Sequence, residues 1–116
     1  MRRNLEGPIH SAILTYLRRQ YPQAVIHHSP NETDVRGPTI ARAIAKQKMM
    51  GMLVGFPDLL MLHQGRLYTF EVKAEGGRTS EAQKAVGEAI VASGGFWAVV
   101  RSIDDVKEKM EQWAES

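Results

Sequence analysis

Two acidic side chains and a lysine occupy residues 55–73 in a pattern that could hold a metal ion beside a phosphate. Asp58 heads one run of β-type residues, and Glu71 and Lys73 end a second run. The runs are joined at Gln64–Gly65, which is typical of a β-hairpin turn. A symmetric turn at that point pairs Asp58 with Glu71, with their Cβ atoms roughly 4.5 to 5.5 Å apart.

The predicted Asp58–Glu71 pair needs a compensating charge, because like charges directly opposite each other destabilise a hairpin. A shared proton or a bound cation would relieve the repulsion, and we favour a divalent cation. Strand alternation puts Glu71 and Lys73 on one face, and we expect this charged face to share a surface with Asp58. The opposite face, which we expect to turn toward the core, consists of Tyr68, Phe70 and Val72.

The same residues resemble the signature of the PD-(D/E)xK nuclease superfamily, with Pro57–Asp58 and Glu71–Lys73 in the motif positions. The flanking Gly55, Ser80 and Gln83 narrow the resemblance to the VRR-Nuc family in its small standalone phage or bacterial form. The family is similar to archaeal Holliday junction resolvases. The resemblance implies a Mg²⁺- or Mn²⁺-dependent endodeoxyribonuclease that cuts four-way DNA junctions as a homodimer.

The resemblance also implies the roles of individual residues. Glu6, in the first helix, matches a carboxylate that the family supplies to the metal, although an acid favoured by the helix dipole explains it as well. Gln83 matches a family position near the attacking water or the phosphate, but Ser80 and Gln83 equally form a capping box. The implied catalytic residues are Asp58, Glu71, Lys73 and Gln83, and the implied metal ligands are Glu6, Asp58, Glu71 and the Val72 carbonyl.

Two loops are candidates for contact with DNA. The turn-rich stretch 29–38 is long, and such loops are uncommon unless they are functional or disordered. Asn31 and Arg36 are the residues that we expect to meet DNA there, and Arg78 is the candidate in the glycine-containing loop after Lys73. His27 and His28 are adjacent in a strand pattern and point to opposite faces, so they do not easily chelate one ion together, and we favour packing or phosphate contact for them.

The order of elements predicts an α/β protein with a restriction-endonuclease-like core, in which a small mixed sheet is flanked by helices. Turn and capping signals give the order αβαββαβα, with a first helix that starts after Asn4 and ends near 21–22. We expect further helices over 39–50, 80–93 and 102–113 and strands over 24–28 and 96–100. The methionines at 49, 50 and 52 are expected to fill the core, with a subunit contact as the alternative.

Composition bounds the function classes. The 116 residues predict one domain over 1–116, and an apolar fraction of 43% is sufficient for one core. The absence of cysteine excludes disulfides, thiolate zinc sites and cysteine nucleophiles. We expect a cytoplasmic protein of a bacterial or phage-infected cell that binds no membrane and no organic cofactor.

Charge is distributed unevenly along the chain. Residues 1–50 carry eight Lys or Arg against three Asp or Glu, and residues 51–116 carry seven against ten. A basic half is compatible with phosphate binding, and it is equally compatible with solvated helix faces. Two alternatives to junction cleavage stay open: a nuclease for flaps, ends or duplex DNA, and a nucleic-acid-binding module without catalysis.

Overall fold

The computed structural model describes residues 5–30 and 38–116. Its elements follow the predicted order αβαββαβα. The predicted bounds differ from the observed ones by about two residues or fewer, and Asn4 lies outside the described residues. The elements are α1 (Glu6–Gln20), β1 (Val25–His28), α2 (Pro38–Met49), β2 (Leu59–His63), β3 (Arg66–Val72), α3 (Glu81–Ala92), β4 (Phe96–Val100) and α4 (Ile103–Ala114).

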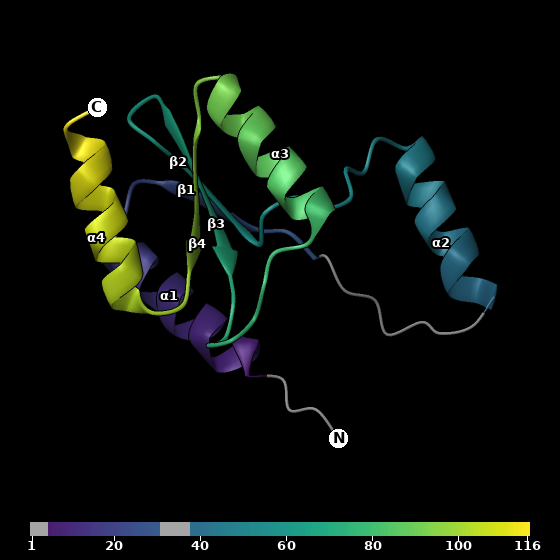
Figure 1. Cartoon of the computed structure of the whole chain (residues 1–116). Helices are drawn as coiled ribbons and strands as arrows, with labels where there is room; N and C mark the ends of the chain where they lie inside the picture. The colour runs from purple at the N-terminus through teal and green to yellow at the C-terminus, as the bar shows by residue number, and fades with distance from the viewer. Residues whose placement is uncertain (1–4, 31–37) are drawn as a thin grey trace.

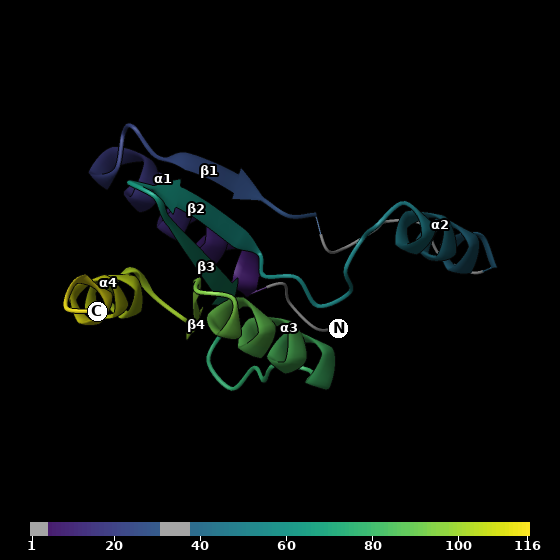
Figure 2. The same ribbon diagram turned by 90° about the horizontal axis from the view of Figure 1, so that it is seen from above.

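The four strands form one mixed sheet in the order β1-β2-β3-β4 (Figure 2). β1 and β3 run antiparallel to β2, and β4 runs parallel to β3. The β2–β3 hairpin turns at Gln64 and Gly65, which both have positive φ, as a two-residue primed turn requires. His63 pairs with Arg66 and Leu59 with Phe70, so the next residue before β2, Asp58, is in line with Glu71 as predicted.

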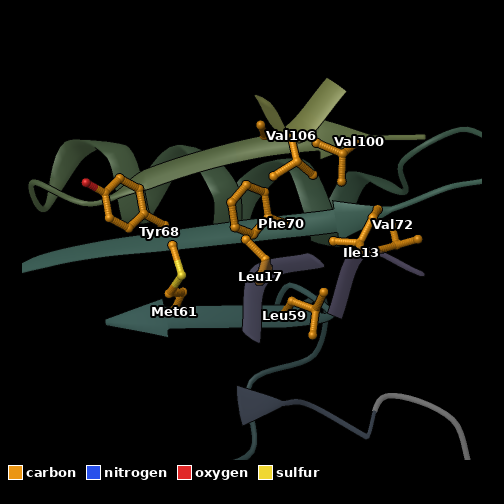
Figure 3. Close-up of a cluster of buried hydrophobic side chains, with 10 residues drawn as sticks. Ile13, Leu17, Leu59, Met61, Tyr68, Phe70, Val72, Val100 and Val106 are labelled. Carbon is orange, nitrogen blue, oxygen red and sulfur yellow. The ribbon is translucent and has the colours of Figure 1, made fainter. Parts of the chain in front are cut away.

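One face of the sheet forms the core with α1 and α4. Tyr68, Phe70 and Val72 of β3 point into this core, as their alternation predicted. Ile13 and Leu17 of α1 meet them and are fully buried. Figure 3 shows this cluster, which also includes Leu59, Met61, Ala98, Val100 and Val106.

The other face of the sheet is covered by α3, so the expectation of a charged surface there was wrong. Thr69 and Glu71 are completely buried on this face. The close packing depends on Gly87 of α3, where an added Cβ would lie 2.2 Å from the ring of Trp97 in β4. At the end of the sheet next to this helix, Asp58 and Lys73 are half-buried.

α2 stands apart from the sheet and its covering helices (Figure 1). None of its side chains in the described range 39–49 is buried. Met49, Met50 and Met52 are 88%, 78% and 40% exposed, so the expectation that they fill the core was wrong. The sequence predicted this helix correctly, but the expected packing of its methionines on the core is not observed. No helix in residues 5–30 or 38–116 has the length and apolar character needed to cross a bilayer.

Candidate active site

Asp58 is held at the point where β2 begins and β1 and β3 end. Its Oδ2 accepts a hydrogen bond of 2.8 Å from the backbone N–H of Val72, the last residue of β3. Its carbonyl oxygen accepts one of 2.9 Å from the N–H of Ser29, just after β1. The residue is therefore fixed by backbone groups of two neighbouring strands, and it is still partly exposed.

Glu71 lies behind Asp58 and is completely buried. Its Oε1 accepts a hydrogen bond of 3.0 Å from Gln83 Nε2, while its Oε2 has no hydrogen-bond donor among the described residues. Burial, followed by the charge of Asp58 and a hydrogen bond to it, raises the pKa of Glu71 to about 8. A raised pKa means that Glu71 itself keeps its proton near neutral pH when no cation is bound.

Gln83 serves as a helix cap and as a partner of Glu71 at the same time. Ser80 and Gln83 form the predicted capping box, in which Gln83 Oε1 accepts from the N–H of Ser80 at 2.8 Å. The same side chain donates from Nε2 to Glu71. We expected the catalytic role of Gln83, near the attacking water or the phosphate, to coexist with the cap only if the side chain is not folded back on it. The side chain is folded back and its Nε2 still reaches Glu71, and the role near the water or the phosphate stays a prediction.

Lys73 extends β3 by one residue toward the open end of the site. Its N–H donates to the carbonyl of Val100 at 3.0 Å, which fixes its backbone beside β4. Its positive charge opposes the rise in the pKa of Glu71, as an ammonium group near that carboxyl must. The loop that follows is anchored by Arg101, whose Nη2 donates to the carbonyl of Gly77 at 2.6 Å.

Gly55 brings the Asp58 segment against the first turn of α3. It has φ +89°, and an added Cβ would lie 2.6 Å from the carbonyl carbon of Ala82. Only glycine combines this backbone conformation with so close an approach. The contact places the segment before Asp58 next to Ala82 and Gln83, which explains why Gly55 belongs to the motif.

A cleft of about 570 Å³ opens in front of Asp58 and runs along α1. Glu6 lines this cleft together with Asp58, and its charge contributes to the raised pKa of Glu71. Within 5–30 and 38–116, however, no three His, Asp or Glu side chains are close enough together to hold an ion. The structure therefore brings Glu6 to the site without placing it as a third ligand.

His10 is a residue of this cleft that the sequence analysis missed. Its ring contacts that of His28 edge-to-face, with 4.7 Å between the centroids. Burial and the neighbouring His28 lower the pKa of His10, while Asp58 acts in the opposite direction. The spacing of four residues from Glu6 on one helix was the available signal, since such residues share a face.

The predicted DNA-contact residues fall in different places. Arg78 is exposed in the loop after β3, where it is free to meet a ligand from solvent. Asn31 and Arg36 lie outside the described residues. Their roles stay predictions, as do those of the four catalytic residues and of the Val72 carbonyl.

The donor set suits a hard divalent cation. Mg²⁺ is usually bound by one or two carboxylates, with water and substrate phosphate completing its coordination. Asp58 and Glu71 provide two carboxylates, and the buried Glu71 Oε2 is an acceptor that no described donor satisfies. A cation between them would replace the proton of Glu71, so the residues present fit Mg²⁺ or Mn²⁺.

Comparison with known proteins decides the family. The sequence matches the VRR-NUC domain over residues 9–104, which is most of the chain. The protein belongs to the VRR-NUC domain family. A VRR-NUC domain is a nuclease-type domain, which implies DNA as its substrate, and the mixed sheet described above fits a restriction-endonuclease-like core.

Two solved structures share this VRR-NUC fold. One, described as "VRR_NUC domain protein", has 24% sequence identity and a TM-score of 0.71, and the match covers 99% of this chain and 92% of the other. A second, described as "VRR_NUC domain", has 21% identity and a TM-score of 0.57 over 91% of this chain and 94% of the other. A comparison with curated proteins found no match.

Proposed function

We propose that this VRR-NUC protein is a Mg²⁺- or Mn²⁺-dependent endonuclease that hydrolyses DNA phosphodiester bonds at Asp58, Glu71 and Lys73. The observation that carries the proposal is the carboxyl pair. Glu71 is buried with an unsatisfied oxygen beside Asp58, and its pKa is raised to about 8. Such strongly perturbed acids in a cleft are typical of functional sites.

Each residue of the site has a chemical role in this reaction. A divalent cation bound by the two carboxylates would neutralise phosphate charge and make a nearby water more acidic. The Val72 N–H orients Asp58, and Gln83 orients Glu71. The ammonium group of Lys73 holds the attacking water or stabilises the charge that develops on the phosphorus oxygens.

Cleavage by a matched pair of lysine variants tests the proposal. Lys73→Ala should lose about 10²- to 10³-fold or more in cleavage rate, the typical cost of removing a positioned charge. Lys84→Ala is the control, because Lys84 is an exposed residue of α3 whose ion pair with Glu81 is 3.9 Å long and mostly in solvent. Both variants should melt like the wild type. Equal cutting by the two variants, or no cutting by wild type with either cation, would contradict the proposal.

We further propose branched DNA, a four-way junction in particular, as the substrate of a homodimer. A junction needs two symmetric cuts, and each chain carries a single Asp58–Glu71 pair, so a C2 dimer supplies both sites. The exposed methionines of α2 and the segment after it support a second copy as the partner. They give this chain an apolar surface that its own core leaves uncovered.

A substrate panel distinguishes junction cleavage from the alternatives. Labelled four-way junctions, flaps, single-stranded ends and plain duplex are incubated with the protein and Mg²⁺ or Mn²⁺. Junction resolution predicts paired symmetric cuts in the junction and much slower cutting of the others. Faster cutting of flaps, ends or duplex would change the proposed substrate, but it would still support the proposed nuclease activity. Binding of DNA without any cutting would favour the module that lacks catalysis.

A further inference from the structure

We propose that the cleft along α1 is a phosphate-binding track, in which His28, His10 and Arg18 hold the DNA backbone next to the bond that is cut. The inference rests on the proposed nuclease function and adds the path of one substrate strand. It comes from the way α1 and β1 meet in the folded chain, which brings His28 of β1 to the same cleft as two residues of α1.

The three residues line the same cleft as Asp58 and Glu6. His10 and Arg18 lie on one face of α1, whereas His28 ends β1, the edge strand beside it. The two imidazole rings are in contact at 4.7 Å. The acidic residues Glu6 and Asp58 lie together in the cleft, and the nitrogen donors lie along it among residues such as Ser11 and Leu14.

The chemistry of these donors fits a phosphate. Burial beside His28 lowers the pKa of His10, so its ring is neutral near pH 7 and can donate one N–H to an anionic oxygen. Arg18 carries a permanent charge and donates in a forked geometry that matches phosphate oxygens. No carboxylate besides Glu6 and Asp58 is among the residues that line the cleft.

The length of the track fits several nucleotides of one strand. Glu6 and Arg18 are twelve residues apart in α1, or about 18 Å along the helix axis at 1.5 Å per residue. Successive nucleotides of one strand of B-DNA rise about 3.4 Å along the axis, and their phosphates lie farther apart than that, so the cleft spans fewer than about five phosphates. His10 is about 6 Å from Glu6 along the same axis, close enough for the phosphate beside the one at Asp58.

The alternative is that the histidines are only an aromatic packing contact. That explanation accounts for the ring geometry, but it does not involve Arg18, which makes no such contact in the described structure. His28 is exposed rather than buried, so packing alone gives it little stabilisation. A test that compares Arg18 and His28 with their sequence neighbours separates the two explanations.

Two matched pairs of variants provide that test. Arg18 and Arg19 both lie in the last turn of α1, but Arg19 lines a different surface, next to Tyr16 and Ile103. His28 and His27 are adjacent in β1, and His27 is not part of the cleft. Fluorescence anisotropy with a labelled DNA duplex, with Ca²⁺ in place of Mg²⁺, measures Kd for all four variants at several salt concentrations.

The track predicts that Arg18→Gln weakens binding about tenfold, the usual effect of losing one charge-assisted hydrogen bond. The slope of log K against log salt should fall by about 0.9 in magnitude, as expected for one lost phosphate contact. His28→Ala should also weaken binding, while Arg19→Gln and His27→Ala stay close to wild type. This pattern would support the track.

The binding and cleavage results together show whether the phosphate track alone is wrong or the nuclease proposal is wrong as well. If wild type cuts DNA but the members of each pair bind equally well, the phosphate track is wrong and the nuclease stands. If wild type neither binds nor cuts DNA, both are overturned. Circular dichroism of the four variants should match wild type, because all four side chains are exposed.

Discussion

The buried carboxyl of Glu71 has opposite effects on stability and on function. Burying an acid without a full set of partners costs free energy, and the raised pKa of Glu71 expresses this cost. The same environment makes the ionised pair a strong ligand once a cation arrives. The site therefore gives up stability in the free protein to create a place where a divalent ion can bind.

This cost should appear as a pH-dependent stability difference between wild type and Glu71→Gln. In the unfolded chain Glu71 loses its proton near its ordinary pKa of 4.5, but in the folded protein only near 8. The folded state holds the extra proton between these values, so the free energy of unfolding of wild type falls as pH rises from 4.5 to 8. Glutamine does not titrate, and the variant should gain on the order of 1 kcal/mol or more relative to wild type by pH 8.5.

Urea denaturation of both proteins at pH 4 and pH 8.5, in EDTA, measures this difference. We expect a small difference at pH 4 and a clear advantage for Glu71→Gln at pH 8.5. Adding Mg²⁺ at pH 8.5 should then stabilise wild type more than the variant, because the ion binds the folded protein through both carboxylates. A difference that stays constant with pH would mean that Glu71 titrates normally.

The two roles of Gln83 can be separated by comparison with Ser80. Ser80→Ala removes the hydroxyl of the cap and should cost about 1 kcal/mol of stability. It keeps the Ser80 N–H that orients Gln83 Oε1, so cleavage should stay near wild type. Gln83→Ala should cost a similar free energy and lower cleavage about tenfold or more, because Glu71 loses its donor. Equal cleavage by the two variants would mean that Gln83 acts only as a helix cap.

Residue types and spacing were enough to predict that Asp58 and Glu71 lie side by side, but not the environment of either. The hairpin register followed from the turn at Gln64 and Gly65, so Asp58 and Glu71 could be brought together in advance. The burial of Glu71 could not, because it depends on α3 packing across the sheet through Gly87 and Trp97. His10 was missed since a lone histidine on a helix carries no sequence signature of its partner.

At the scale of elements, the segment between α2 and β2 positions the site through a single close contact. Gly55→Ala should destabilise the protein by about 1–3 kcal/mol or more, because it adds both an unfavourable φ and a clash with the backbone of Ala82. Gly51→Ala is the control. Gly51 also has a positive φ, at +105°, but an added Cβ there would meet nothing within 4 Å.

Thermal melting and cleavage of the two glycine variants provide the measurement. Gly51→Ala should cost about 1–2 kcal/mol for its backbone conformation alone and cut DNA at nearly the wild-type rate. Gly55→Ala should melt lower and cut more slowly, since Asp58 follows the displaced segment. If both variants melt and cut alike, the approach of Gly55 to α3 has no role in forming the site.

The element order was predictable because capping residues, turns and apolar spacing are local signals. Ser80 and Ser102 do cap the helices that follow them, and Ser93 to Gly95 ends α3 as expected. The position of α2 was not predictable. Its spacing of apolar residues predicts a helix, but it does not predict which surface the helix packs against. We expected its methionines to fill the core, but in the single chain they are exposed.

At the scale of the whole molecule, α2 and the residues after it predict self-association. Met49, Met50, Leu53 and Val54 are each 45% or more exposed, which is an unusual cluster for a chain that works alone. We expect sedimentation of wild type at micromolar concentration to show a dimer. Met50→Lys should shift it toward monomer, because a charge would be buried in the interface.

Val25→Lys is the matched control for this prediction. Val25 is also a large apolar residue, 62% exposed, but it lies in β1 at the edge of the sheet. The control should sediment like wild type. A wild-type protein that remains a monomer would count heavily against junction resolution. If Met50→Lys is still a dimer, the interface does not involve this part of α2.

The central claim is that Asp58 and Glu71 bind one divalent cation between them, and a crystal soaked with Mn²⁺ tests it most directly. The anomalous difference map should show a peak in contact with Asp58 and with Glu71 Oε2, and this peak should be absent from crystals of Asp58→Asn soaked in the same way. A map with no peak there, or with manganese bound only elsewhere, at His10 and His28 for example, would contradict the account.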